Sequence, residues 1–387
     1  MMKEKFCILV LMKAKLYLSL LLLTGFFISA QTGVTVVDSI YSGSLWRTYR
    51  LYKPLSYTGT QAYPLVLNLH GYTSTSFAQQ YYGNFMPVAD TAKFLIVHPQ
   101  GTKDGSNQPY WNAGISPTAV NDLQFLSQLI DSLKIIYNID PNSIYSTGMS
   151  NGGFMSNFLA CNLSNKIAAI AGVTGTMFTT VSATCNPGRP VPVMHIHGTA
   201  DPTVPYNGGT GTLAVDSLMK FWRIKNNTNA VPTTSAVPNI NTTDGCTADH
   251  FLWSSGTLGA TNELYRINGG AHTWPGATTI IGVTNQDFNA SVEIWRFFRK
   301  YKLNMFTGVQ EFGVESSGFG VFPNPASNLI TIKTDKEFTA IVLDVFGKEV
   351  VAKTNSNTID ISSLNSGIYF LRINSEGNYF TKKIIKE

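Results

Sequence analysis

Continuous apolar runs recur through the larger, N-terminal part of the chain and predict strands that are buried on both faces. The clearest are PLVLNLH at residues 64–70 and FLIVHP at 94–99. Shorter runs of the same kind lie at 143–148, 168–173, 191–197 and 263–267. Such strands are typical of a parallel sheet that helices cover on both sides.

Segments with helical periodicity lie between these runs. In residues 121–137, apolar side chains recur at helical spacing, and Asn121 or Asp122 is placed to cap the start. Further helices are expected directly after Ser150, near 213–225 and near 288–301. Strands that alternate with helices predict an α/β fold with a mostly parallel sheet.

The pattern changes after Leu303. Residues 304–318 form a Gly/Ser-containing linker with little periodicity, and no segment from 319 onward is typical of a helix. Short apolar strands such as NLITIK, FTAIVLDVFG, GIYFLRI and NYFTKKII are separated by turn-forming pairs. We therefore expect a small all-β sandwich at 319–387, after a larger α/β domain at 31–303.

The first thirty residues have the layout of a secretory signal peptide. A basic start precedes an apolar run at 16–28, and the small residues Ser29 and Ala30 follow. The apolar run is shorter than the roughly twenty residues that span a bilayer. We expect removal of residues 1–30 and a mature chain without a transmembrane segment.

Charge and composition exclude some classes of function. The chain is 44% hydrophobic and 13% charged, which is typical of a folded globular protein. Its formal net charge is +5, and the segment before residue 31 contributes +3 of it (four lysines and one glutamate), which leaves +2 for the rest. So small a charge argues against a nucleic-acid partner.

Three cysteines lie beyond the signal segment, namely Cys161, Cys185 and Cys246. In an exported chain, one disulfide and one free thiol is the simplest arrangement. We expect Cys161 to pair with Cys185, since their separation could tie the helix after Ser150 to a neighbouring loop. No CxxC or Cys/His cluster indicates a metal site.

The segment GMSNGG places Ser150 in a G-x-S-x-G pattern between an expected strand and an expected helix. In this context the pattern predicts a nucleophile elbow, a strained turn that exposes the serine oxygen. A serine hydroxyl needs a histidine base, and that base needs a carboxylate to fix its tautomer. Chain order and the position after a strand favour His272 as the base and Asp201 as the acid, with Asp216 as the weaker alternative.

Two backbone N–H groups would stabilise the oxyanion of a tetrahedral intermediate, and the pattern points to those of Tyr72 and Asn151. Trp111 and Trp274 are candidates for an aromatic wall around the substrate, although packing in the core explains them almost as well. His195 and His197 would share one face of a strand, but no further ligand completes a metal site. His250 is expected in a polar loop.

Five motifs in order, LHGYTS, YWNAG, GMSNGGFMSNFLAC, HIHGTADPTVPY and GGAHTWPG, resemble the secreted polyhydroxybutyrate depolymerase and feruloyl esterase family over roughly residues 35–303. The resemblance implies an α/β-hydrolase fold, ester hydrolysis through an acyl-enzyme and no cofactor. It implies catalytic roles for Ser150, Asp201 and His272, a place for Trp274 in the substrate wall and a structural role for Asp122. Relatives often pair a cysteine like Cys246, but its usual partner is missing here.

The C-terminal segments VFPNPASNLITIK, LDVFGKEV and IDISSLNSGIYFLRI, with the ending KKIIKE, are similar to the type IX secretion sorting domain of Bacteroidetes. This implies recognition by the type IX secretion machinery and release outside the cell or attachment to its surface. A carbohydrate-binding sandwich is the alternative.

The sequence thus predicts a secreted serine hydrolase of carboxylic esters. Its substrate would be a polyhydroxybutyrate-type polyester or a feruloyl or acetyl ester of plant polysaccharide. Two alternatives stay open: a serine peptidase, and a catalytically silent surface protein that uses a hydrolase scaffold for binding or adhesion.

Overall fold

The computed structural model describes residues 33–116, 119–305, 320–344, 347–375 and 378–387. The expected signal peptide and most of the expected linker lie outside the described residues. The boundaries between the expected domains therefore stay predictions. In the part of the chain that the structure describes, no helix is long and apolar enough to cross a membrane.

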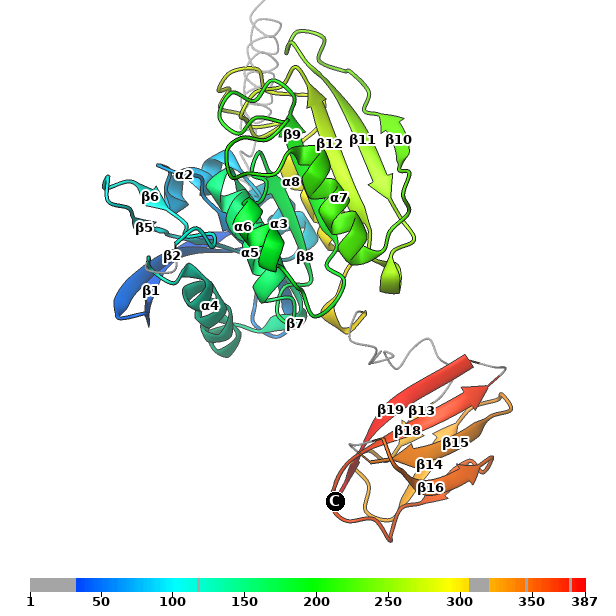
Figure 1. Cartoon of the computed structure of the whole chain (residues 1–387). Coiled ribbons are helices and arrows are strands. Elements are labelled where there is room, and N and C mark those ends of the chain that lie inside the picture. The colour runs from blue at the N-terminus through cyan, green and yellow to red at the C-terminus, as the bar shows by residue number, and fades with distance from the viewer. Residues whose placement is uncertain (1–32, 117–118, 306–319, 345–346, 376–377) are drawn as a thin grey trace, which may run out of the picture.

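A ten-stranded sheet forms the centre of the N-terminal domain (Figure 1). Its strand order is β1-β2-β4-β3-β7-β8-β9-β12-β11-β10. The six strands from β4 to β12 in this order are parallel to their neighbours, and antiparallel strands flank them on both sides. The strands are β1 (Val34–Ser42), β2 (Leu45–Lys53), β3 (Tyr63–Leu69), β4 (Leu95–Pro99), β7 (Ile139–Met149), β8 (Ala169–Val173), β9 (Val193–Gly198), β10 (Thr233–Ala236), β11 (Thr247–Trp253) and β12 (Asn262–Asn268). This arrangement confirms the predicted α/β-hydrolase fold.

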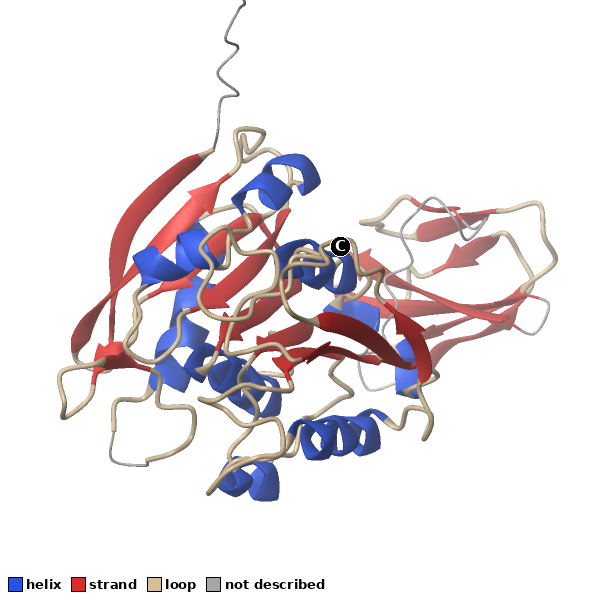
Figure 2. Ribbon diagram, turned by 90° about the horizontal axis from the view of Figure 1, so that it is seen from above, coloured by secondary structure: helices blue, strands red, loops and turns tan. Residues whose placement is uncertain are grey.

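Helices pack on both faces of this sheet, as Figure 2 shows from above. One face carries a core formed with α4, α5, α6 and α7, and the other carries a core formed with α2, α3 and α8. The helices are α2 (Ser76–Tyr82), α3 (Met86–Ala92), α4 (Asp122–Ile136), α5 (Asn151–Asn162), α6 (Thr179–Thr184), α7 (Val215–Asn226) and α8 (Ala290–Phe298). Smaller elements are the hairpin β5 (Thr102–Lys103) with β6 (Pro109–Tyr110), and the 3-10 turns η1 (Thr257–Gly259) and η2 (Leu303–Met305).

Local sequence explains why these elements form where they do. Asn121 caps α4, since its side chain accepts a hydrogen bond of 2.9 Å from the backbone N–H of Gln124. Strand β4 is buried at every position, as its continuous apolar run predicts. The outer strands β1, β2, β10 and β11 are more exposed than β4 and gave no clear apolar run. His250, which we expected in a loop, lies in β11.

A buried carboxylate on β12 contacts α8, where the Arg296 guanidinium lies 3.4 Å from it, and the segment just after that helix. The Glu263 side chain is 1% exposed and accepts hydrogen bonds from Lys300 at 2.9 Å and from His250 at 3.0 Å. Burial opposes ionisation of Glu263, but these hydrogen bonds outweigh it and lower its pKa to about 2. The pair of elements is thus held by charge as well as by apolar packing.

The C-terminal residues form two small antiparallel sheets around their own apolar core. One sheet has the order β13-β14-β17 and the other β16-β15-β18-β19. The strands are β13 (Gly320–Phe322), β14 (Leu329–Lys333), β15 (Thr339–Leu343), β16 (Glu349–Thr354), β17 (Thr358–Asp360), β18 (Gly367–Ser375) and β19 (Asn378–Lys386). The predicted all-β domain is confirmed.

Candidate active site

The three residues that the sequence assigns to catalysis follow neighbouring parts of the sheet. Ser150 comes directly after β7, Asp201 follows the end of β9 by three residues, and His272 follows the end of β12 by four. Strands β7, β8, β9 and β12 are consecutive parallel neighbours. Their carboxyl ends meet at one edge, where ligands bind in open α/β sheets.

Ser150 adopts a strained backbone conformation, with φ 54° and ψ −121°. Such conformations cost about 1–3 kcal/mol and persist only where the surroundings impose them. Here the Ser150 N–H donates to the Val173 carbonyl at 2.8 Å, and its own carbonyl accepts from Gly153 and Phe154 at the start of α5. The chain therefore turns from strand to helix at this residue, as a nucleophile elbow requires.

The glycines on either side of Ser150 permit a close approach to strand β3. A Cβ atom on Gly148 would lie 2.6 Å from the Leu69 carbonyl oxygen, and one on Gly152 would lie 2.2 Å from it. Both distances are shorter than any real Cβ contact. No other residue fits these two positions without a shift of the backbone.

His272 and Asp201 are in direct contact. The Nδ1–H of His272 donates to Oδ2 of Asp201 at 2.7 Å, and the His272 side chain keeps 17% of its surface exposed. The hydrogen bonds among the described residues join His272 to Asp201 and not to Ser150. The structure thus brings two of the three predicted residues into contact and places the third at the same edge.

Both carboxylate oxygens of Asp201 have polar partners. Its Oδ1 accepts from the backbone N–H groups of Thr203 and Val204 at 2.8 and 2.9 Å, and His197 lies 3.3 Å from Oδ2. Burial opposes ionisation, but the hydrogen bonds from His197 and His272 outweigh it and hold the pKa of Asp201 well below its usual range. These contacts therefore favour the ionised form of Asp201.

The alternative acid, Asp216, has a different partner. Its Oδ1 accepts a hydrogen bond of 2.9 Å from the Tyr206 hydroxyl on the surface. The geometry favours Asp201 as the partner of His272.

The backbone N–H groups of Tyr72 and Asn151 occupy equivalent places beyond two paired strands. Leu69 of β3 is the register partner of Gly148 of β7, and each amide belongs to the residue three positions further on. A Cβ on Gly71 would lie in ordinary contact with the Ser150 Cβ, at 3.4 Å. Neither amide donates to another described residue. Both N–H groups are thus available as hydrogen-bond donors to a substrate oxygen beside Ser150.

The two predicted substrate-binding tryptophans are not at a surface. Trp111 is 0% exposed and Trp274 is 1% exposed. The Trp111 indole N–H donates to the His70 carbonyl at 2.9 Å, and that of Trp274 donates to Ser291 at 3.1 Å. The predicted aromatic wall is therefore wrong for this structure, because apolar burial and these internal hydrogen bonds place both rings in the core.

His195 and His197 are buried on β9 and form a pair with 3.0 Å between Nε2 of His195 and Nδ1 of His197. Burial, with His197 beside it, lowers the pKa of His195 well below its usual value. Among the described residues, no group of three or more His, Cys, Asp or Glu side chains could hold a metal ion. His197 instead contacts Asp201, and His195 contacts His197.

The predicted disulfide between Cys161 and Cys185 is confirmed. It links the last turn of α5 to the end of α6. Cys246 is a free, buried thiol, and burial raises its pKa to about 11.

Profiles of known families match two segments of the chain. Residues 58–241 match the phospholipase/carboxylesterase family, and residues 320–387 match the secretion system C-terminal sorting domain. The second match confirms the predicted type IX sorting domain and indicates export to the outside of the cell or its surface.

Curated relatives match parts of the chain. A bifunctional acetylxylan esterase/xylanase of Neocallimastix patriciarum is 35% identical over 39% of this chain and 21% of the relative. Feruloyl esterase B of Piromyces equi is 30% identical over 45% and 33%, and poly(3-hydroxyalkanoate) depolymerase C of Paucimonas lemoignei is 30% identical over 29% and 28%. The matches span between a fifth and a third of the length of these relatives.

Among solved structures, an acetyl xylan esterase from Aspergillus awamori aligns with a TM-score of 0.47 at 15% identity. That alignment covers 63% of this chain and 94% of the other.

Proposed function

We propose that the protein is a secreted serine esterase with Ser150, His272 and Asp201 as its triad, and the match of residues 58–241 to the phospholipase/carboxylesterase family supports this. The observation that carries the proposal is the 2.7 Å hydrogen bond between Asp201 and His272 at the edge where the strained Ser150 turn lies. These are the groups that activate a serine hydroxyl.

The proposed triad would carry out acylation as follows. Nε2 of His272 takes the proton from the Ser150 hydroxyl, and the oxygen attacks the carbonyl carbon of the ester. The N–H groups of Tyr72 and Asn151 stabilise the tetrahedral oxyanion. His272 then gives its proton to the leaving alcohol, and an acyl-enzyme remains on Ser150.

Deacylation uses the same groups. His272 takes a proton from water, the hydroxide attacks the acyl carbon, and the return of the proton to Ser150 releases the carboxylic acid. Asp201, ionised throughout, keeps the proton of His272 on Nδ1 and stabilises the imidazolium.

We assign the substrate to the acetyl or feruloyl esters of plant polysaccharide. The xylan- and ferulate-directed relatives match longer segments of the chain than the polyhydroxyalkanoate depolymerase does. Hydrolysis of a hydroxyalkanoate polyester is the alternative within the same chemistry.

The test is the release of product from p-nitrophenyl acetate, methyl ferulate, acetylated xylan and polyhydroxybutyrate film by the purified protein and by Ser150→Ala. Ser182→Ala, on helix α6, is the matched control. We expect Ser150→Ala to lower kcat by several orders of magnitude, as removal of a triad nucleophile does, and Ser182→Ala to leave it unchanged. Retention of most activity in Ser150→Ala would show that the nucleophile is elsewhere.

Two outcomes separate the substrate from the chemistry. Preference for the polyester film over the polysaccharide esters would overturn the substrate assignment only. If no ester is cleaved and a fluorophosphonate does not label Ser150, the scaffold binds without catalysis.

A further inference from the structure

Exposed aromatic side chains gather on one face of the hairpin β1–β2 and on the neighbouring helix α2. Trp46 is 70% exposed, Tyr41 61%, Phe77 56% and Tyr81 51%. Single exposed apolar residues are normal on a surface, but a group of them marks an interaction site. We propose that this hairpin face, with Arg50 among its rings, binds the sugar chain of a polysaccharide that carries uronic acid groups. The inference rests on the proposed function, which supplies the polysaccharide substrate.

The strand register places the groups of the hairpin on one face. Tyr41 pairs directly with Trp46, and Val37 pairs directly with Arg50. In an antiparallel pair, directly opposite side chains share a face, and so do side chains two or four positions apart along one strand. Trp46 and Arg50 are four positions apart, so about 13 Å separates them along β2. The two pairs therefore form one row along the hairpin.

Helix α2 adds its own rings to this row. Nε of Arg50 donates to the Gln80 side chain at 2.7 Å, and Gln80 donates to the Thr35 hydroxyl at 2.9 Å. The guanidinium carbon of Arg50 lies 5.1 Å from the centre of the Phe77 ring. The Phe77 ring centroid lies 5.0 Å from that of Tyr81, one helical turn further on. Arg50 thus connects the rings of α2 to the hairpin.

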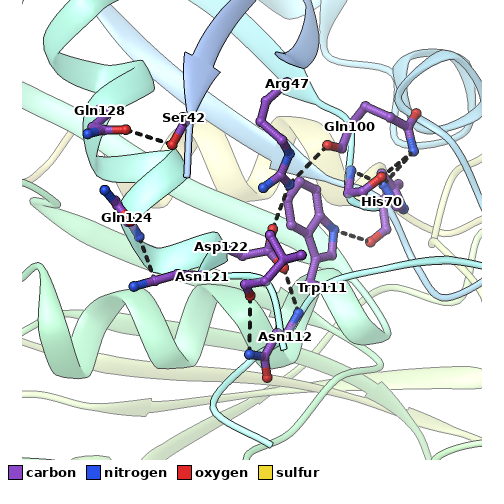
Figure 3. A network of polar contacts seen from close by, with 12 residues as sticks. Ser42, Arg47, His70, Gln100, Trp111, Asn112, Asn121, Asp122, Gln124 and Gln128 are labelled. Carbon is purple, nitrogen blue, oxygen red and sulfur yellow. Dashed lines mark hydrogen bonds and ion pairs between the residues drawn. The ribbon is translucent and has the colours of Figure 1, made fainter. Parts of the chain in front are cut away.

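The opposite face of the hairpin is anchored to α4, which holds the exposed face in place. Figure 3 shows Ser42 and Arg47 of the hairpin in contact with residues of this helix. The Ser42 hydroxyl donates to Gln128 at 2.6 Å, and Arg47 forms a buried ion pair of 2.6 Å with Asp122. Little ordering of the hairpin is therefore needed when a ligand binds, and this favours affinity.

The tip of the hairpin lies at the edge of the sheet that carries Ser150. Tyr49 of β2 pairs with Pro99, the last residue of β4, and β4, β3 and β7 are consecutive parallel neighbours. Because β2 runs antiparallel to β4, the turn that precedes Leu45 extends beyond the carboxyl end of β4. A polymer chain at the candidate site can therefore reach the hairpin face along one edge of the sheet.

The chemistry of the hairpin face fits an acidic sugar chain. The C–H groups of a pyranose ring stack on the electron-rich faces of aromatic rings. Ser39 and Thr48, which pair with each other on this face, offer hydroxyl groups that can bond to sugar hydroxyls. No described carboxylate forms an ion pair with Arg50, so its guanidinium can pair with a uronate. An apolar polyester would leave this charge without a partner.

The experiment measures the binding of glucuronoxylan and of neutral arabinoxylan to the full chain by affinity electrophoresis. All proteins in it carry Ser150→Ala, so that the proposed hydrolysis does not alter the ligand. We expect Trp46→Ala and Phe77→Ala each to weaken binding of both glycans about tenfold, since each removes one stacking ring. Arg50→Gln should weaken the binding of glucuronoxylan alone, by about threefold, as loss of an exposed ion pair does.

Ile135→Ala is the matched control, because Ile135 is 87% exposed on α4, which packs on the other side of the sheet. It should bind both glycans as the protein with Ser150→Ala alone does. Added salt should remove the preference for glucuronoxylan, since salt screens exposed charges. In proteins that retain Ser150, Trp46→Ala should raise KM on acetylated glucuronoxylan by about the factor by which binding weakens.

The other occupants of the face give different results. Unchanged glycan binding in Trp46→Ala and Phe77→Ala would overturn the proposal. A change from dimer to monomer in Trp46→Ala, with glycan binding intact, would overturn it in favour of a contact between two copies of the chain. Tighter binding to polyhydroxybutyrate film than to glucuronoxylan, lost in the same variants, would overturn it in favour of a polyester. If glucuronoxylan binds but no ester is cleaved and a fluorophosphonate does not label Ser150, the proposed function fails and the glycan site stands.

Discussion

Substitution of Gly175 by alanine should disable the site although Gly175 lies outside the recognisable serine motif. Gly175 follows β8 by two residues and faces the elbow. A Cβ at this position would lie 2.0 Å from the Ser150 carbonyl oxygen, 2.9 Å from the Ser150 carbonyl carbon and 3.0 Å from the Gly153 Cα. All three neighbours are backbone atoms, which cannot move aside as a side chain can.

The size of the effect follows from these distances. Real Cβ atoms essentially never approach closer than 3.0 Å, so the Ser150 carbonyl must move by about 1 Å. Overpacking of this kind costs about 1–3 kcal/mol in stability. A misplacement of about 1 Å in a catalytic group costs about 100-fold in rate. We therefore expect kcat of Gly175→Ala to fall about 100-fold while the protein still folds.

The assay is kcat on p-nitrophenyl acetate together with thermal unfolding by circular dichroism. Gly188→Ala is the control, because its nearest neighbour would be the Ser164 hydroxyl at 3.7 Å, an ordinary contact. Gly188→Ala should match the unsubstituted protein in both measurements. A Gly175→Ala protein with unchanged kcat would refute the reasoning, since it would mean that the elbow relaxes without loss of its catalytic geometry.

Three further predictions follow from the described contacts. Asp201→Asn should lower kcat about 10⁴-fold by favouring the wrong histidine tautomer, and Asp216→Asn should leave kcat unchanged; a reversed pair of results would reassign the acid. The folded-state pKa of Glu263, about 2, lies below its ordinary 4.5, so its stabilisation is complete above about pH 4.5 and lost as the pH falls toward 2. Glu263→Gln should lose about 1–3 kcal/mol at pH 7 and show a flatter acid-side dependence of Tm; an unchanged slope would contradict this. Cys246, with a pKa of about 11, should react with a thiol reagent only after unfolding, and rapid labelling of the native protein would disprove its burial.

The sequence predicted the central strands and the longer helices because those elements are buried in a periodic way. The apolar runs at β3 and β4 and the row of apolar residues at helical spacing on α4 are compatible with few other secondary structures. The hairpin β1–β2 and the pair β10–β11 were missed. Strands at or next to a sheet edge are partly exposed to solvent, and these show neither a continuous apolar run nor a clear alternation of apolar and polar residues. Tertiary pairing, and not local pattern, decides their structure.

Some residues of the candidate site could likewise be predicted from the sequence, and others could not. Residues in short motifs with a fixed chain order, such as Ser150, Asp201 and His272, could be assigned from the sequence, although their catalytic roles stay predictions. Trp111 was misassigned because a tryptophan near a motif looks the same whether its ring faces a ligand or the core. The contacts of His70 with Gly101 and Gln100 join residues about thirty positions apart, and no local sequence pattern predicts them.

The paired register of Leu69 with Gly148 bears on how this scaffold could be redesigned. Because each proposed oxyanion amide lies three residues beyond that pair, the pairing of β3 with β7, about 4.8 Å apart, sets where both segments leave the sheet. Loops elsewhere on this edge of the sheet could be exchanged to accept a different acyl or alcohol group without moving the N–H groups of Tyr72 and Asn151. A library for new ester specificity should therefore leave 68–72 and 148–153 untouched, together with Gly175, Asp201 and His272, and place its diversity at the other positions of the loops that follow β8, β9 and β12.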